Sequence, residues 1–268
     1  HVYRIGCGKR PLFLTETPIA RPERKIDLKK AIRDGEVIGK TPDDKLIFLF
    51  QPHESSPVMR EIGRLRERTF RAVGEGTGKR RDLDGFDHYY QHLVLWDEHD
   101  LEIAGAYRFV DAGTVVAEKG FGGLYSGSLF NLDEKRCHFI NSSLELGRSF
   151  VQQRYWGKRS LDYLWYGIGA YLARNPQYRY LFGPVSISNA TPKMAKDLLI
   201  YFYKLYFSAG PGMSCSRNPF NFSQPESELK LHFSGQDYTA DFKKLKSLLG
   251  NLGTAVPTLY KQYTELCK

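Results

Sequence analysis

The chain has few cysteines and no long apolar run, and each shortage excludes a class of protein. Four cysteines occur among 268 residues, at positions 7, 137, 215 and 267, and no two form a CxxC pair. This spacing argues against a disulfide framework and a zinc knuckle, and it favours a reducing, cytoplasmic location. The longest apolar stretches, such as Leu46 to Phe50, are far shorter than the roughly 20 residues that cross a bilayer. We therefore expect no transmembrane span.

Metal and targeting signals are also lacking. His88 and His92 have the spacing of one helical turn, but Tyr89 stands where a HExxH motif requires glutamate. We therefore expect no metal site. The chain starts at His1 without a charged-then-apolar leader, so we expect a trimmed sequence with an upstream domain missing.

Positive charge is what the sequence has in excess. The formal net charge is +9, and residues 60–81 alone hold eight basic and three acidic side chains, a local net charge of +5. Such a segment attracts an anion. Nucleic acid, an anionic membrane surface and an acidic carrier protein all satisfy that requirement, and charge alone does not choose among them.

The order of predicted elements indicates an α/β protein. With 41% apolar residues the chain is long enough for a substantial core. We expect an irregular arm over residues 1–56 and one folded domain over 57–268, in which strands and helices alternate as in a sheet with crossovers. The expected helices are Leu28–Asp34, Pro57–Val73, Ser160–Arg174, Thr191–Phe207 and Asp241–Leu249. The expected strands are Leu46–Phe50, Leu93–Trp96, Glu102–Val110, Leu144–Val151, Tyr178–Val185 and Leu229–Phe233, with a final element at Leu259–Leu266.

Two arginines stand at apolar positions of these elements. Arg66 falls in the middle of the apolar face of the helix that begins at Pro57, and Arg108 lies inside an otherwise apolar strand. An unpaired buried guanidinium costs several kcal/mol, so both need a partner. Asp84 and Asp87 lie three residues apart between these two elements. They are candidates for that role, and a helix cap or a solvated loop charge is the alternative for each.

The sequence Glu145-Leu-Gly-Arg148 forms a further candidate site. Strict alternation would place Glu145 and Arg148 on opposite faces of a strand, but a β-bulge at Gly147 would bring both toward one face. With a helix N-terminus following after a short loop, the strand would offer a base, a cation and backbone donors for an anion. A structural ion pair at a sheet edge is the alternative.

In order and local spacing, these residues together resemble the acyl-homoserine-lactone (autoinducer) synthases of the GNAT superfamily. The Glu-Leu-Gly-Arg strand and the segments Gly123–Tyr125, Leu181–Ser188 and Leu259–Tyr263 are similar to the ornithine-lipid N-acyltransferases and the related hemolysin-like group. The residues that carry the resemblance to the synthases are Arg66, Phe70, Asp84, Asp87, Arg108, Glu145 and Arg148.

The resemblance implies a three-layer GNAT fold, in which helices flank a mixed, twisted sheet with a bulged and splayed strand pair. It also implies transfer of a 3-hydroxylated fatty acyl group from acyl carrier protein to the amine of a small amino acid such as ornithine. Glu145 and Arg148 would be catalytic, and Arg66, Phe70, Asp84, Asp87 and Arg108 would bind substrate. The phosphopantetheine donor would contact Phe150, Val151, Gly157, Lys158 and Ser186, and the carrier protein would dock on exposed Arg64, Arg68 and Arg71. No tightly bound cofactor and no nucleic acid are expected. A fused upstream acyltransferase domain and a peripheral contact with the inner membrane surface fit such an enzyme.

Two departures from the resemblance bear on the substrates. A glycine-rich loop at Gly74, Gly76 and Gly78 replaces an aromatic residue of autoinducer synthases. The segment from Gln153 to Lys158 matches poorly the pyrophosphate loop of acetyl-CoA-dependent relatives, which favours a carrier-bound donor. An acetyl-CoA-dependent amine acetyltransferase, an acyl-homoserine-lactone synthase and a basic non-catalytic module on nucleic acid or membrane stay open as alternatives.

Overall fold

The computed structural model describes residues 16–52, 55–133, 137–208 and 213–266, and these residues form two compact units. The first unit combines the chain up to Arg108 with Arg148–Tyr171. The second combines Phe109–Gly147 with the chain from Leu172 onward. Neither unit is one continuous stretch of the chain. Within the described residues, no helix is both long enough and apolar enough to span a bilayer.

The main sheet has six strands in the order β1-β2-β3-β4-β6-β7, and it is mixed. β1–β2 and β2–β3 are antiparallel pairs, whereas β6 and β7 run parallel. Its strands are β1 (Glu36–Lys40), β2 (Leu46–Phe50), β3 (Gln91–Asp97), β4 (Glu102–Asp111), β6 (Ser143–Val151) and β7 (Tyr180–Phe182). Pairing with β7 covers only the first three residues of the nine-residue β6.

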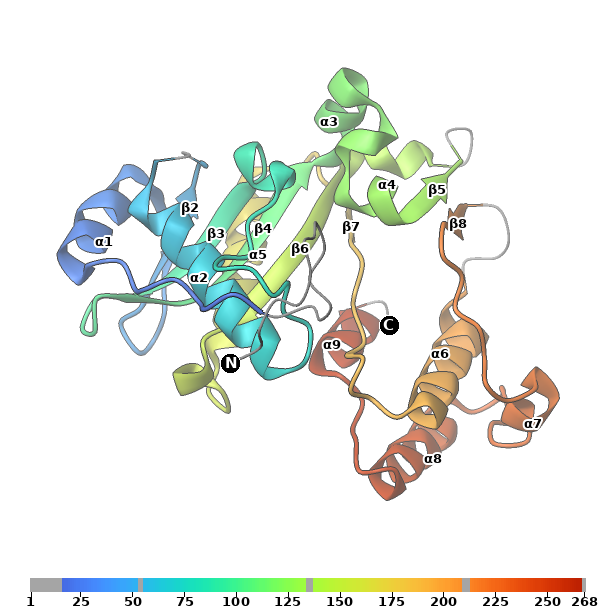
Figure 1. Ribbon diagram of the computed structural model, residues 1–268. Coiled ribbons are helices and arrows are strands. Elements are labelled where there is room, and N and C mark those ends of the chain that lie inside the picture. The colour runs from blue at the N-terminus through green and yellow to red at the C-terminus, as the bar shows by residue number, and fades with distance from the viewer. Residues whose placement is uncertain (1–15, 53–54, 134–136, 209–212, 267–268) are drawn as a thin grey trace, which may run out of the picture. The chain divides into compact units, whose positions relative to one another are not determined.

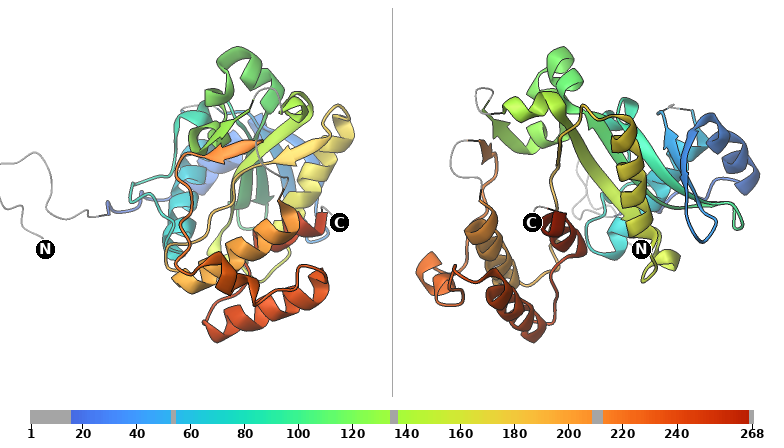
Figure 2. Two further views of the ribbon diagram at one scale, coloured as in Figure 1. Left: turned by 90° about the vertical axis from the view of Figure 1, so that its right-hand side faces the viewer. Right: turned by 180° about the vertical axis from the view of Figure 1, so that it is seen from behind.

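In the first unit, helices cover both faces of the sheet (Figures 1 and 2), with α2 on one face and α5 on the other. Buried Ile62 and Leu65 of α2 pack in one core with Val94 and Trp96 of β3. On the opposite face Gly167 of α5 lies so close that a Cβ there would meet Ile47 and Leu93. The helical elements of this unit are α1 (Lys25–Ala31), η1 (Ile32–Asp34), α2 (Pro57–Ala72), η2 (Gly85–His88), η5 (Gln153–Tyr155) and α5 (Ser160–Arg174).

The second unit contains a small two-stranded sheet and a helical core rich in aromatic side chains. In that core, Phe202 packs with Phe233, Tyr238 and Phe242. The remaining elements are α3 (Ala112–Lys119), η3 (Phe121–Gly123), α4 (Tyr125–Leu129), β5 (Phe130–Leu132), η4 (His138–Ser142), α6 (Lys193–Phe207), β8 (Ser214–Ser216), α7 (Glu226–Lys230), α8 (Tyr238–Asn251) and α9 (Thr258–Leu266).

Most expected elements are present, but some differ from the expectation. The strand expected at Leu229–Phe233 is wrong, because Leu229 belongs to α7, and Leu231 is 81% exposed rather than part of an alternating face. Within the arm expected over residues 1–56, the strand Leu46–Phe50 is confirmed as β2 and the expected helix is present as α1 and η1, but the edge strand β1 was not expected. The expected strand at Tyr178–Val185 shortens to Tyr180–Phe182.

Candidate active site

Helix α2 carries Arg66 into the interior. Ser56 caps the helix by accepting a hydrogen bond from the Val58 amide, and Pro57 occupies the first turn, as the sequence predicted. Arg66 is 1% exposed, and its guanidinium makes two hydrogen bonds to Asp87, at 2.7 and 3.1 Å. Its Nε also donates to Asp82 at 3.4 Å. The need for a buried partner is therefore met by two carboxylates.

Asp84 and Asp87 have a second task besides ion pairing. They form a capping box around η2, in which Asp84 accepts from the Phe86 amide and Asp87 accepts from the Asp84 amide. Burial alone would raise the pKa of Asp87, but the charges and hydrogen bonds of Arg66 and the charge of Arg108 outweigh that effect and lower it well below the usual range. Both aspartates are therefore held as carboxylates.

Arg108 of β4 joins the same carboxylates from the sheet. Its Nη1 lies 2.6 Å from Asp84 and 3.0 Å from Asp87, and its guanidinium lies over the rings of Phe86 and Tyr90. Burial would lower the pKa of Arg108, but the hydrogen bond to Asp84 and the charges of the two carboxylates raise it instead. The predicted need for a partner is again met.

Arg148 completes what we call the arginine–aspartate network, which comprises Arg66, Arg108, Arg148, Asp82, Asp84 and Asp87. Its guanidinium lies 3.3 Å from Asp84 and 3.7 Å from Asp82. The φ angle of Arg148 is +49°, a left-handed conformation that costs an L-residue roughly 1 kcal/mol. The irregularity expected at Gly147 thus falls on Arg148. Three cations balance three anions, so the network is neutral.

His92 of β3 lies next to this network but does not share its charge. Its ring is 1% exposed, and Nε2 is 3.7 Å from Asp87. Burial, together with the charges of Arg66 and Arg108, lowers the pKa of His92 to about 3 despite the attraction of Asp87. His92 is therefore a neutral side chain at neutral pH. It belongs to a strand, not to the helical turn that its spacing from His88 suggested.

The glycine-rich loop that leads to Asp82 is fixed on α2 by a carboxylate. Glu67, which is fully buried, accepts hydrogen bonds from the amides of Thr77 and Gly78 and from the Thr77 hydroxyl. Farther along, the Asp82 amide donates to the carbonyl oxygen of Gly63. A Cβ at Gly63 would lie 2.5 Å from Leu83, so glycine is required for the loop to pack this closely.

Glu145 belongs to the second unit. Its carboxylate is 1% exposed and accepts hydrogen bonds from the amides of Tyr125 and Ser126, at 3.0 and 2.6 Å, where α4 begins. The carboxylate therefore fixes the first turn of α4. Its Cα pairs with that of Phe182 across β6 and β7.

The predicted donor-binding residues lie in different surroundings. Phe150 is buried in the core of the first unit, so its side chain is committed to packing, whereas the Val151 carbonyl accepts from the Trp156 indole. Gly157, whose φ is +72°, and exposed Lys158 form the loop before α5. Ser186 is exposed in the second unit.

One residue of the predicted carrier-docking set needs correction. Arg64 is buried, not exposed, because it forms two hydrogen bonds to Glu61 one helical turn away. Arg71 is 19% exposed at its side chain and pairs with Glu67 and Glu16, while Arg68 is exposed as predicted. The formal charge of this segment is therefore partly neutralised by local pairs.

Sequence reasoning missed Asp82, His92 and Glu67 as members or supports of the site. Asp82 had no spacing relation to another carboxylate that favoured it over its neighbours in a charged loop. The fully buried Glu67 was readable only as one solvated charge among many on a basic helix.

Comparison with known proteins agrees with this architecture. Residues 65–166 match the family model described as an acetyltransferase (GNAT) domain, a range that includes all six residues of the network. The chain is 32% identical over 262 residues to a glycine N(alpha)-acyltransferase of Bacteroides thetaiotaomicron, covering 92% of this chain and 77% of that protein. The arginine–aspartate network therefore lies within the part of the chain that is similar to known acyltransferases.

Relatives that match a shorter part of the chain are named for a different acceptor. An L-ornithine N(alpha)-acyltransferase of Brucella abortus is 34% identical over 47% of this chain and 44% of its own length, and one of Agrobacterium fabrum is 30% identical over 60% and 46%. No solved structure gives a significant match. The chain belongs to the N-acyltransferases of the GNAT superfamily, and it is an enzyme rather than a non-catalytic binding module.

Proposed function

We propose that this N-acyltransferase moves a fatty acyl group from acyl carrier protein to the α-amine of a small amino acid. We expect the acyl group to be 3-hydroxylated. The identity of the acceptor is inferred from the part of the network that solvent can reach. Its two partly exposed members are one cation and one anion, Arg148 and Asp84, whose side chains are each 25% exposed, while the other four are almost fully buried. A zwitterionic amino acid offers the matching pair of charges.

The residues would divide the chemistry as follows. Arg148 would hold the α-carboxylate, and Asp84 would receive the ammonium group before it loses a proton. Asp87 cannot take that part, because Arg66 and Arg108 occupy it. The free amine attacks the thioester carbonyl, so a nitrogen–carbon bond forms and the carbon–sulfur bond breaks. The amine proton ends on the departing thiol.

Glu145 is the proposed base, acting directly or through a water molecule. Backbone amides beside the strand pair β6–β7 would stabilise the tetrahedral oxyanion, and each such donor contributes about 3 kcal/mol.

The donor part of the proposal rests on charge and on the loop before α5. Arg68, Lys79 and Arg80 are exposed cations on α2 and the loop after it, which suits an acidic carrier protein. The loop containing Gly157 and Lys158 lacks the pyrophosphate-binding sequence that free CoA would favour. The phosphopantetheine thioester is the only cofactor-like group in the proposal.

Glycine is the first acceptor to test, and ornithine is the second. The relatives named for glycine match 92% and 82% of this chain, whereas those named for ornithine match 47–60%. An N-acyl amino acid is amphiphilic. The proposal therefore includes a cytoplasmic location with peripheral contact to an anionic membrane. It also includes a partner acyltransferase that esterifies the product.

The test is an acyl-transfer assay with the same acyl chain on carrier protein and on CoA, with glycine, ornithine and glycinamide as acceptors. We expect N-acylated glycine or ornithine by mass spectrometry, faster turnover from the carrier protein, and little product from glycinamide, which lacks the carboxylate for Arg148. Equal use of glycine and glycinamide would contradict the acceptor assignment. Faster turnover from acyl-CoA would contradict the donor assignment.

A further inference from the structure

A second basic surface lies on and around α1, which contacts α2 of the basic segment 60–81. Residues 21–33 hold six basic and two acidic side chains, a net charge of +4. Both acidic side chains are already engaged, because Glu23 pairs with Arg60 and Arg81, and Asp27 pairs with Arg24. Within the described residues, only Arg24 has its acidic partner inside the segment, so most of the segment's positive charge is not cancelled there.

Three cations of this segment, Arg21, Lys30 and Arg33, are exposed, and none of them forms a salt bridge in the part of the chain that the structure describes. Arg33 lies near Glu98, and the Trp96 indole, Lys29 and the charge of Arg33 together lower the pKa of that carboxyl. Lys29, in contrast, pairs with Glu98 at 3.1 Å. The segment thus presents cations that an external anion can reach without breaking an existing ion pair.

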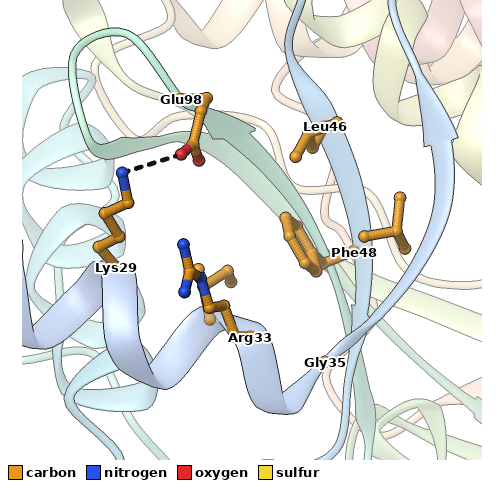
Figure 3. Close-up of a pocket in the computed structure, with 8 residues that line it drawn as sticks. Lys29, Arg33, Gly35, Leu46, Phe48 and Glu98 are labelled. Atoms are coloured by element: carbon orange, nitrogen blue, oxygen red, sulfur yellow. Dashed lines mark ion pairs between the residues drawn. The ribbon is translucent and has the colours of Figure 1, made fainter.

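Apolar groups accompany these cations. Ile26 is 53% exposed on α1, and Val37 is 48% exposed on β1. A cavity of about 290 Å³ opens beside them, lined by Ile32, Val37, Leu46 and Phe48 below and by Lys29, Arg33 and Glu98 at its edge. Figure 3 shows the Arg33 side chain rising from the helical segment between Lys29 and Phe48, with the Lys29–Glu98 ion pair beside it.

We propose that this surface, made of α1, η1 and the cavity between them and β1–β2, docks the enzyme on an anionic lipid bilayer. The cations would contact lipid phosphates, and exposed Ile26 and Val37 would enter the boundary between headgroups and acyl chains. We call it the α1 surface. The α1 surface is the place where the membrane contact of the proposed function would occur. This inference rests on the proposed function only for the biological use of the contact.

Two other anionic partners fit the surface less well. β1 lies four strand positions from β6, roughly 19 Å at about 4.8 Å per strand, so a carrier protein on α1 would present its thioester far from Arg148. Single-stranded nucleic acid stacks on exposed aromatic rings, and duplex DNA binds mainly through its phosphates, whereas this surface adds exposed aliphatic groups on α1 and β1 that neither would use. An acidic bilayer satisfies both the charge and the aliphatic groups.

The test is co-sedimentation with vesicles of phosphatidylcholine, with and without phosphatidylglycerol, using the whole chain. We expect binding only to the anionic vesicles, weakened by salt. Each basic residue near such a surface contributes about a fivefold factor, so removing two by Lys30→Gln/Arg33→Gln should weaken binding roughly 30-fold. Ile26→Ser should weaken it further at high salt, where the charges are screened.

The matched control carries the same charge change elsewhere. Lys243 and Lys246 are exposed on α8, and Lys243→Gln/Lys246→Gln should leave vesicle binding nearly unchanged. Equal losses of vesicle binding in the two double variants would overturn the assignment of the α1 surface, and so would binding of the wild type to uncharged vesicles. Release of the protein from anionic vesicles by millimolar inorganic phosphate would point to a free anion as the ligand instead. Tighter binding of apo carrier protein than of vesicles at this surface would also contradict the proposal. Acyl transfer from a short soluble donor is measured in parallel. Failure of that activity would count against the proposed function, while the vesicle result stands by itself.

Discussion

At the scale of single residues, the site depends on where each carboxylate is already committed. Asp87 is enclosed by two arginines, Glu145 fixes the first turn of α4, and Asp84 alone among the predicted acids combines an ion pair with partial exposure. The sequence indicated that Arg66 and Arg108 need partners, and the partners are Asp84 and Asp87. It did not indicate Asp82, because the geometry that joins it to Arg66 and Arg148 arises only from the folded loop.

Glu145→Gln should retain the fold and lose about two to four orders of magnitude in acyl-transfer rate. The amide oxygen of glutamine still accepts from one of the two backbone amides of α4, whereas its NH2 group faces the other amide, which lowers stability, and cannot take a proton from the amine. The measurement is kcat with a saturating carrier-bound donor, alongside far-UV circular dichroism. A variant that turns over at the wild-type rate would leave Glu145 with the capping role alone.

His92 should make the stability of the protein depend on pH below neutrality. Its pKa in the folded protein is about 3, compared with about 6.5 when unfolded. The unfolded chain therefore binds a proton first as the pH falls. Stability from this residue is fully present above about pH 6.5 and is lost progressively down to pH 3, by about 2 kcal/mol at pH 5.

The check is urea unfolding at pH 7 and pH 5 for the wild type and for His92→Gln. The variant is expected to be less stable at pH 7, because a core side chain is changed, but to lose about 2 kcal/mol less than the wild type between the two pH values. Parallel losses in both proteins would show that His92 is already protonated in the native state or stays solvated. His99, which is 95% exposed at its side chain, offers the control substitution.

At the scale of elements, local signals were enough for α2 but not for the edge of the sheet. Ser56 and Pro57 mark the start of α2 without any tertiary information, and Gly74 with φ of +76° follows its end. β1 was missed because it is a short edge strand with mostly exposed residues, which leaves no alternation to read. Leu229 to Phe233 alternates as a strand would, yet α7 forms there.

Gly63→Ala tests how closely the loop carrying Asp82 must pack on α2. The added methyl group would lie 2.5 Å from Leu83, so we expect a loss of roughly 1–3 kcal/mol in unfolding free energy and a lower kcat/KM, because the carboxylates of the loop shift. Leu83→Ala, added to Gly63→Ala, removes the clash and should recover part of the activity. A double variant no better than the worse single variant would contradict the steric explanation.

At the scale of the whole molecule, the distribution of charge matters more than its total. The sequence showed a net charge of +5 over residues 60–81, but it did not show that Arg60, Arg64, Arg71 and Arg81 are paired with Glu23, Glu61 and Glu67. Glu23 lies far away in the chain from Arg60 and Arg81, whereas Glu61 and Glu67 pair with arginines within one helical turn. A binding partner would therefore contact only the basic side chains that stay exposed.

Charge reversal at Arg68, Lys79 and Arg80 should lower kcat/KM for a carrier-bound donor, most strongly at low salt, because rim charges act mainly on the encounter rate. A small thioester analogue should be used as well as before. Arg64→Glu is a poor probe of docking, since it breaks a buried pair and unsettles the helix. If the triple variant impairs both donors equally, the effect lies in the chemistry or the fold, and carrier docking on this segment is contradicted.

The division of the chain into interleaved units has a consequence for dissecting the enzyme. Arg108 and Arg148 belong to one unit, but Phe109–Gly147 of the other unit lies between them in the sequence. Any contiguous fragment that retains both arginines therefore carries 39 residues of the second unit with it, without the rest of that unit's core. Truncation from either end cannot isolate the network. A minimal version would need an internal excision, with Arg108 and Arg148 rejoined through a short linker, or a circular permutation that moves the chain ends.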